Sequence, residues 1–237
     1  MDDEMVTAVA ELRRASSTGG DLARPLLGAL PVTGLSIATM GDLLPTGTVA
    51  ATDDQAARLD ELQFDLGEGP CWDAVAARRP VLEPDVAGSP VRVWPAFSRA
   101  LADEPIGALF AFPLLLGPLA LGAMDLWCDH AHDLSDEHAL RASALAREVS
   151  RHLLRAAVRE IADEQHDDAV TDRFSRRHVH QATGMVLAQV GVSPEDAELL
   201  LQGHAFATGT SMREVADDVL AGRLSFATRP TGIEESS

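Results

Sequence analysis

The sequence contains no lysine, no asparagine and no tyrosine. All 19 basic residues are therefore arginine, and with 37 acidic residues the formal net charge is −18. This excess of negative charge excludes a protein that coats nucleic acid or anionic membranes non-specifically, because phosphate groups would repel it. If the protein binds RNA or DNA, the contact must come from a local cluster of arginines.

Aromatic residues are few, so the core must be built from leucine, valine, alanine and isoleucine. The alanine-rich stretches favour helices. Cysteine occurs only at Cys71 and Cys128, which are far apart in the sequence. Two such thiols, with no signal peptide ahead of them, predict a protein of the reducing cytoplasm.

One hydrophobic stretch, residues 106–124, carries no charged side chain and reaches the length of a membrane span. Proline and glycine interrupt it at Pro113, Gly117, Pro118 and Gly122. We therefore expect two buried strands joined by a turn at 116–118, and no contact with a membrane.

The 237 residues suffice for one domain of ordinary size and a smaller one. Over residues 1–134, short amphipathic helices alternate with strand-like segments and turns rich in glycine and proline. This mixed order predicts an α+β domain in which helices flank one antiparallel sheet.

A long helix is expected to begin at Ser135 and to form a connecting segment over residues 135–169. Its apolar residues recur at every fourth position: Leu145, Val149, Leu153, Ala157 and Ile161. This row predicts that the helix pairs with its counterpart in a homodimer. Arginines on another face of the helix are interleaved with glutamates and indicate a solvated surface.

Residues 170–227 predict a compact tail of three helices. A serine precedes the second helix at Ser193, and Ser211 with Glu214 fits a capping box at the start of the third. The inward stripe of the second helix is expected to contain Ala197, Leu200, Leu201, His204 and Ala205. Residues 228–237 are expected to be disordered because of their polar composition.

Two sets of motifs resemble known families. LQFDLGEGPCWDAV at 62–75, WPAF at 94–97 and FPLLLGPLALGAMDLW at 112–127 resemble GAF sensor domains. In the tail, QATGMVLAQ at 181–189, SPEDAELLL at 193–201 and SMREVADDVL at 211–220 resemble ANTAR domains. The order of the two is similar to that of actinobacterial GAF–ANTAR regulators.

ANTAR domains are RNA-binding three-helix modules, usually dimeric, which stabilise a paired-hexaloop antiterminator hairpin. The resemblance implies that this protein is a transcription antitermination regulator with a hairpin RNA as partner, under the control of a GAF-like sensor domain. The ligand or upstream partner of that sensor is not identified. A cyclic-nucleotide signature of the Asn-Lys-Phe-Asp-Glu type is excluded, because the sequence has neither asparagine nor lysine.

The start of the first tail helix carries the local basic cluster. Arginine can pair with a phosphate through two hydrogen bonds or stack on an unpaired base. The small residue Gly184 would allow close approach of RNA or of a neighbouring helix, and Thr183 stands where the family often has a basic residue. The predicted RNA-binding residues are Arg173, Arg176, Arg177, His178, His180, Gln181, Thr183, Gly184 and Arg213. Alternatively, the arginines neutralise the nearby aspartates Asp167, Asp168 and Asp172.

The residues predicted to line a ligand pocket in the sensor domain are Phe64, Cys71, Trp72, Trp94 and Phe112. These side chains could equally form ordinary core.

The runner-up function is a DNA-binding helix-turn-helix regulator with a GAF ligand sensor. The chain after Gly222 is too short for a further recognition helix, and a recognition helix at 211–220 would bring Asp217 and Asp218 near phosphate. An enzyme is not expected, since Cys71 has no neighbouring base in the sequence. Cys128 with His130 and His132 resembles half of a metal site, but we expect neither metal nor cofactor.

Overall fold

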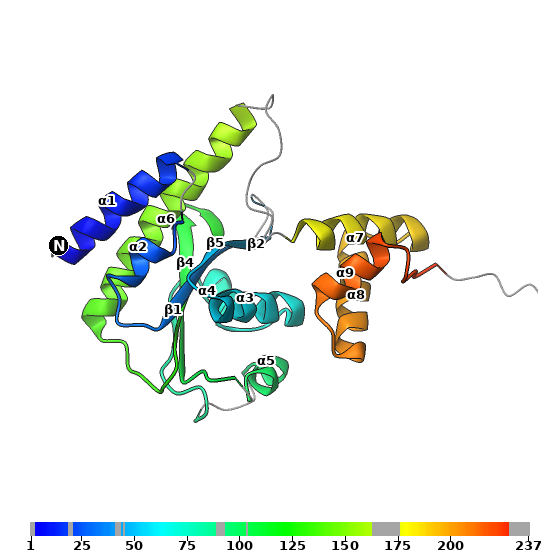
Figure 1. Cartoon of the computed structure of the whole chain (residues 1–237), viewed down its shortest axis with the longest axis horizontal. Coiled ribbons are helices and arrows are strands. Elements are labelled where there is room, and N and C mark those ends of the chain that lie inside the picture. The colour runs from blue at the N-terminus through cyan, green and yellow to red at the C-terminus, as the bar shows by residue number, and fades with distance from the viewer. Residues whose placement is uncertain are drawn as a thin grey trace, which may run out of the picture. The chain divides into compact units, whose positions relative to one another are not determined.

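The computed structural model describes residues 3–18, 21–40, 44, 46–88, 93–102, 104–162 and 176–227. The chain divides between residues 175 and 176 into two compact units (Figure 1), here named the first unit and the tail. Each has its own hydrophobic core. The expected boundary at residue 170 and the segment 228–237 lie outside the described residues.

The first unit is built on a five-stranded antiparallel sheet of order β2-β1-β5-β4-β3. Its strands are β1 (Gly34–Thr39), β2 (Gly47–Ala51), β3 (Val81–Glu83), β4 (Ala108–Leu116) and β5 (Leu119–Cys128). The central strands β1, β5 and β4 are buried on both faces, so they are apolar along most of their length rather than alternating. The predicted α+β class is confirmed.

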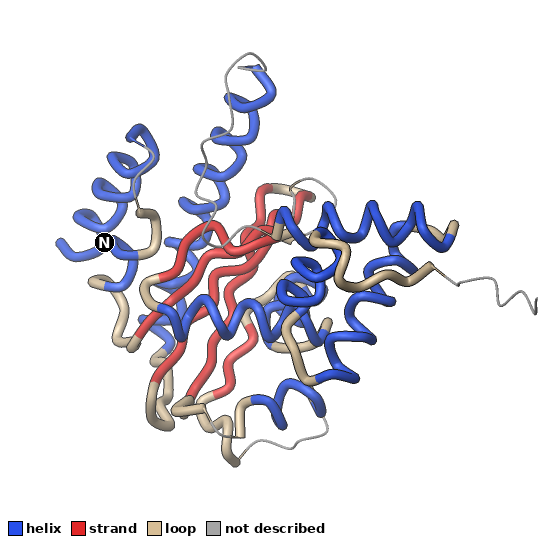
Figure 2. The backbone as a smooth tube through the Cα atoms, turned by 45° about the vertical axis from the view of Figure 1, so that its right-hand side comes forward, coloured by secondary structure: helices blue, strands red, loops and turns tan. Residues whose placement is uncertain are grey.

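Three helices cover one face of the sheet: α1 (Asp3–Thr18), α2 (Arg24–Leu27) and α6 (Asp136–Ala162). Figures 1 and 2 show this layer on the side of the sheet opposite to α3 (Asp54–Leu66) and α4 (Pro70–Ala77). The largest core cluster lies between the sheet and α1, α2 and α6.

The apolar row of the long helix is used inside this core. Leu145, Val149 and Leu153 of α6 are buried against the sheet of their own chain. The prediction that this row pairs two copies of the helix is therefore wrong for these three residues, because their apolar surface is already covered. The side chain of Ile161 lies outside the described residues.

On the other face, α3, α4 and α5 (Pro95–Ala100) cover the sheet. Asp53 is the N-cap of α3, and its carboxylate accepts a hydrogen bond of 2.8 Å from the backbone N–H of Ala56. Gly67 ends α3 in the left-handed conformation with φ of 63°, which glycine adopts without strain. The first unit therefore encloses its sheet between two layers of helices.

The stretch 106–124 forms the hairpin of β4 and β5, as predicted from its prolines and glycines, with the turn at Gly117. Gly122 has φ of +154°, and a Cβ built there would lie 1.9 Å from the carbonyl oxygen of Ala38. β1 and β5 can thus pair closely only with glycine at this position. Among the described residues, no helix is long and apolar enough to cross a membrane.

The tail consists of α7 (Arg177–Val190), α8 (Pro194–Thr208) and α9 (Met212–Leu220). Ser193 caps α8, and the capping box of Ser211 and Glu214 opens α9, as expected. The core of the tail contains Val179, Ala182, Val186, Ala197, Leu201, Ala205, Met212, Val215, Ala216 and Val219. Leu200, expected on the inward stripe of α8, is instead 38% exposed.

Candidate functional site

The exposed face of α7 holds much of the predicted RNA-binding set. His180, Gln181 and Gly184 stand three, four and seven residues after Arg177, so the four residues lie on the same side of the helix, and all four are exposed. We call these four residues the α7 face. The α7 face therefore carries a guanidinium, an imidazole and an amide, next to a glycine that has no side chain. These groups can donate hydrogen bonds to phosphate and to base edges.

Gly184 is not required by packing within the tail. Apart from its chain neighbours and the backbone of its own helix, a Cβ built at Gly184 meets no atom of the described residues within 4 Å. Thr183 beside it is half-buried, and its hydroxyl donates to the carbonyl oxygen of Val179 at 2.8 Å. The threonine hydroxyl is thus turned back onto its own helix, whereas Gly184 leaves room for a molecule that approaches from outside.

Arg176 does not belong to the exposed surface. Its side chain is only 9% exposed, and its Nη2 lies 3.3 Å from the Sδ of Met212 at the start of α9. The alkyl part of an arginine covers apolar surface well, which suits this position at the junction of α7 and α9. The structure therefore removes Arg176 from the residues that RNA could reach, although sequence spacing alone grouped it with Arg177.

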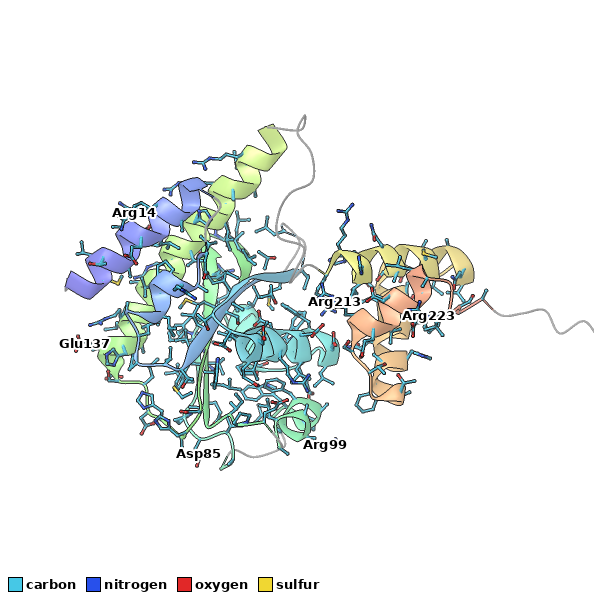
Figure 3. The ribbon with its side chains drawn as sticks, viewed as in Figure 1. Arg14, Asp85, Arg99, Glu137, Arg213 and Arg223 are labelled. Atoms are coloured by element: carbon cyan, nitrogen blue, oxygen red, sulfur yellow. The ribbon has the colours of Figure 1, made fainter. Side chains whose placement is uncertain are left out.

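The remaining predicted RNA-binding residues differ in how exposed they are and in what they contact. His178 is half-exposed, and its Nδ1 lies 2.6 Å from Oδ1 of Asp217 on α9. Arg213 is half-buried in the first turn of α9, and Figure 3 shows it at the end of the tail where α7 begins. Arg173 lies outside the described residues. Within the tail, Arg213 thus joins the same end as Arg177, while His178 is engaged by an aspartate.

In the first unit, the motif LGEGPC connects three helices. Gly67 ends α3, and the next residue, Glu68, reaches the start of α5. Its Oε1 accepts hydrogen bonds from the backbone N–H groups of Ala96 at 2.5 Å and Phe97 at 2.7 Å. A carboxylate at the first N–H groups of a helix is favourable, because these donors have no partner within the helix.

Gln63 of α3 holds the start of α4 from the other side of the motif. Its side-chain oxygen accepts from the backbone N–H of Cys71 at 2.8 Å, and its backbone oxygen accepts from Nε1 of Trp72 at 2.8 Å. Gly69 has φ of 137°, and a Cβ there would lie 2.6 Å from the same Gln63 oxygen. The motif that resembles GAF domains therefore links α3, α4 and α5 through these hydrogen bonds. We call this connecting segment the α3–α4 joint.

The five residues predicted to line a ligand pocket are not brought together. Phe64, Cys71 and Trp72 form one cluster, and Trp94 belongs to a neighbouring cluster on the same face of the sheet. Phe112 is fully buried on the opposite face, in the core with α6. Since successive residues of a strand point to opposite faces, Phe112 cannot share a pocket with the other four.

A small cavity of about 10 Å³ lies beneath α3, which is room for about one water molecule. Its lining includes Ser36, Gln63, Asp125 and Trp127, but none of the five predicted residues. The Oδ1 of Asp125 and the Nε1 of Trp127 are buried without a hydrogen-bond partner among the described atoms. The polar atoms that face this cavity were not predicted from the sequence.

Two carboxyl groups are buried next to this cavity. Asp60 of α3 accepts hydrogen bonds from the hydroxyls of Ser36 at 2.6 Å and Thr48 at 2.9 Å, and Asp125 of β5 accepts from Nε2 of Gln63 at 2.6 Å. Burial raises the pKa of Asp60 to about 7, although both hydroxyls favour its charged form. Burial, together with the charge of Asp60, also raises the pKa of Asp125 well above its usual range.

The cysteines show no sign of activation. Burial, together with the charges of Asp125 and Asp60, raises the pKa of the Cys71 thiol, and burial also raises that of Cys128. A thiol that keeps its proton is a poor nucleophile and metal ligand. Within the described ranges, no group of three or more His, Cys, Asp or Glu side chains is placed to hold a metal ion.

Several solved structures are similar to this chain at low identity. The GAF domain of a phosphoenolpyruvate-protein phosphotransferase from Coxiella burnetii is 14% identical, with a TM-score of 0.49 over 68% of this chain and 99% of that chain. The corresponding GAF domain from Acinetobacter is 11% identical, with a TM-score of 0.49 over 70% and 100%. Free methionine-R-sulfoxide reductase from Neisseria meningitidis is 16% identical, with a TM-score of 0.43 over 68% and 95%.

These TM-scores are below 0.5, so the GAF-like nature of the first unit stays a prediction from its motifs. No curated protein matches the sequence. The family model described as ANTAR domain matches residues 169–220. That range contains all of α7, α8 and α9, so the sequence pattern of an ANTAR domain coincides with the helical bundle of the tail.

Proposed function

We propose that this protein is an RNA-binding regulator of transcription antitermination, in which the tail binds a hairpin RNA and the first unit senses a signal. The observation that carries this proposal is the ANTAR match over the three helices of the tail. The GAF-like motifs of the first unit supply the sensing role. The protein acts as a cytoplasmic homodimer and catalyses no reaction.

The RNA contacts are proposed to centre on the α7 face and Arg213. With a formal net charge of −18, the chain as a whole repels RNA, and attraction must come from a few closely spaced donors. Arg177 and Arg213 supply charge near the shared end of α7 and α9. His180 and Gln181 offer ring and amide groups for base edges, and Gly184 lets the RNA backbone approach the helix.

The helix-turn-helix alternative is less well supported. After α9, the described chain returns to α7, where the backbone N–H of Phe226 donates to Oε1 of Gln189 at 2.8 Å. If α9 itself were the recognition helix, Asp217 and Asp218 would enter the groove. These two carboxylates pair with His178 and Arg223 and would lose those partners on approaching phosphate.

Homodimer contacts must come from surfaces other than the buried row of α6. In the tail, Leu199 and Phe206 of α8 are 60% and 67% exposed, and a spacing of seven residues places them on one side of the helix. Two large apolar side chains on one side of a helix offer a surface that a partner can cover. Equilibrium sedimentation of the protein with Phe206→Ser would test whether this side of α8 contributes to the dimer.

The direct test of RNA binding is fluorescence anisotropy of a labelled two-hexaloop hairpin RNA titrated with the full chain at several salt concentrations. Arg177→Ala should weaken binding and lower the slope of log K against log salt by about one unit for one lost phosphate contact. Arg223→Ala is the matched control, because Arg223 follows the C-terminal end of α9, whereas Arg213 lies in the first turn of that helix. It is already paired with Asp218 at 2.7 Å.

Equal losses for the two arginine variants would rule out the α7 face as the binding surface. Binding that does not respond to salt would rule out phosphate contacts. A duplex DNA of the same length serves as competitor. If the duplex displaces the hairpin, the helix-turn-helix alternative replaces the present proposal.

A further inference from the structure

The buried carboxyl groups Asp60 and Asp125 are linked through both α3 and the sheet. Ser36 of β1 is paired in register with Asp125 of β5, and the hydroxyl of Ser36 donates to Asp60 at 2.6 Å. Paired residues on one face of a sheet have Cβ atoms about 5 Å apart. Gln63, one turn after Asp60 on α3, donates to Asp125 at 2.6 Å. Two acidic side chains are thus held within one compact hydrogen-bonded group.

This group is closed to solvent. Asp60 is 1% exposed, Asp125 8%, Ser36 2% and Gln63 2%. Two ionised carboxylates in such a position would each lose their hydration and would also repel each other. The arrangement is stable only if at least one of the two groups carries a proton.

No cation compensates these charges in the part of the chain that the structure describes. The arginines on the elements around the pair are engaged elsewhere: Arg58 of α3 with Glu104 at 2.6 Å, and Arg78 after α4 with the backbone oxygens of Gly117 and Pro118. Arg99 of α5 donates to the backbone oxygen of Pro95. The remaining titratable groups near the pair are the Cys71 thiol and Asp73 of α4. β1 and β2 contribute only the hydroxyls of Ser36 and Thr48, and β4 carries no ionisable side chain.

We propose that the ligand of the first unit is a proton, bound by the pair of Asp60 on α3 and Asp125 on β5. This inference rests on the proposed sensing role of the first unit. The cavity beside Asp125 has room for about one water molecule, which is enough space for the exchange of a proton. Asp125 lines this cavity, and its buried Oδ1, which has no hydrogen-bond partner among the described atoms, is one of the four oxygens that can carry the proton.

Loss of the proton has a defined mechanical effect. With both carboxylates charged, repulsion acts between α3 and the central strand β5, and solvation of the charges requires α3 to move away from the sheet. Gln63 then carries the motion to α4, since it holds the backbone of Cys71 and the indole of Trp72. The direction follows from the raised pKa values: the pair is protonated and closed at acidic pH, Asp60 loses its proton as pH rises through about 7, and the pair opens once Asp125 has lost its proton as well.

Tryptophan fluorescence of the full chain offers a direct readout. The chain has three tryptophans and no tyrosine, and Trp72, Trp94 and Trp127 all lie on the face of the sheet that carries the pair. The experiment records emission between about pH 5 and pH 9, where unperturbed aspartates do not titrate. We expect a reversible change at or above neutral pH, where the second proton leaves the pair.

Substitutions of Asp60 and Asp125 test whether these two groups cause the fluorescence change. Asp60→Asn leaves a single carboxylate, so the doubly charged state cannot form and the fluorescence change should be strongly reduced. Asp60→Asn with Asp125→Asn should abolish the change, because an asparagine amide stays neutral and retains hydrogen bonding. Asp136→Asn, in the exposed first turn of α6 on the opposite face of the sheet, is the matched control and should behave as the unsubstituted protein.

A flat profile of the unsubstituted protein would overturn the proton site. A transition that the folded double variant retains would also overturn it, since histidines would then be the source. If the double variant does not fold, as judged by far-ultraviolet circular dichroism, an undiminished transition in Asp60→Asn alone would be decisive against the proposal. Absence of hairpin binding at every pH would instead refute the RNA function and leave the tryptophan transition unaffected.

Discussion

Glu68 is expected to be the main contact between the α3–α4 joint and α5. Glu68→Ala removes two hydrogen bonds from its carboxylate to the backbone N–H groups of Ala96 and Phe97. Hydrogen bonds to a charged group contribute about 1.5 to 3 kcal/mol each, and Glu68 is only half-buried, so we expect a loss of about 2 to 3 kcal/mol in the free energy of unfolding. Glu68→Gln should lose less than half of this, because its amide oxygen can still accept.

Thermal unfolding followed by tryptophan fluorescence measures this loss, since Trp94 is the N-cap residue of α5. For a chain of this size, the expected fall in Tm for Glu68→Ala is about 5 to 10 °C. Glu137→Ala is the matched control. It removes a glutamate whose side chain is 78% exposed and whose pair with Arg141 at 3.3 Å lies at the surface, so its effect should stay below about 1 kcal/mol. Equal Tm values for Glu68→Ala and Glu137→Ala would refute the assigned role of Glu68.

Three further substitutions have defined outcomes. Because the folded-state pKa of Asp60 is raised from 3.8 to about 7, its contribution to stability is complete below its unfolded pKa and declines as pH rises towards 7. Urea unfolding should show a fall of about 1.4 kcal/mol per pH unit from this group, and Asp60→Asn should reduce that slope. Gly122→Ala should destabilise the first unit by more than about 3 kcal/mol, because its Cβ would lie 1.9 Å from the Ala38 oxygen, and a soluble variant of unchanged Tm would contradict this geometry. Arg176→Ala should lower the stability of the tail by about 1 to 3 kcal/mol, whereas Arg177→Ala should leave it nearly unchanged; helix melting by circular dichroism compares the two.

Much of the fold follows from local sequence signals. The serine caps at Ser193 and Ser211, the aspartate cap at Asp53 and the turn at Gly117 act within a few residues, so they can be identified without knowledge of the tertiary structure. The mixed order of helices and strands likewise predicts the α+β class. These features depend on backbone geometry that neighbouring residues determine.

The site depends on contacts between residues that are distant in the sequence, so the sequence predicts it less completely than it predicts the fold. The prediction placed Phe112 on the wrong face of the sheet. Because β4 is apolar on both sides, no alternation of polar and apolar residues shows which face each side chain occupies. The prediction placed Arg176 among the exposed arginines, because the sequence around Arg176 gives no sign of its contact with Met212, 36 residues later.

The buried polar group was missed for a similar reason, since Asp60 and Gln63 look like ordinary surface residues of a helix. One signal was present: Asp125 is a single carboxylate within a strand of otherwise uncharged residues, where every charge needs an explanation.

The pairing of β1 with β5 also determines how the protein folds during synthesis. Gly34 pairs with Trp127, so the two partners are separated by about 90 residues. At translation rates of about 5 to 20 residues per second, β1 leaves the ribosome about 5 to 20 s before its central neighbour, with one edge unpaired. During this interval the nascent chain exposes a strand that can associate with other chains.

The tail has no such delay. α7, α8 and α9 follow one another through short connections that begin at the left-handed glycines Gly191 and Gly209. Contacts between neighbouring helices form rapidly, so the tail can fold as soon as its last helix is released, whereas the first unit must wait for the arrival of β5. Chaperone binding to ribosome-bound nascent chains should therefore end only after β5 has emerged.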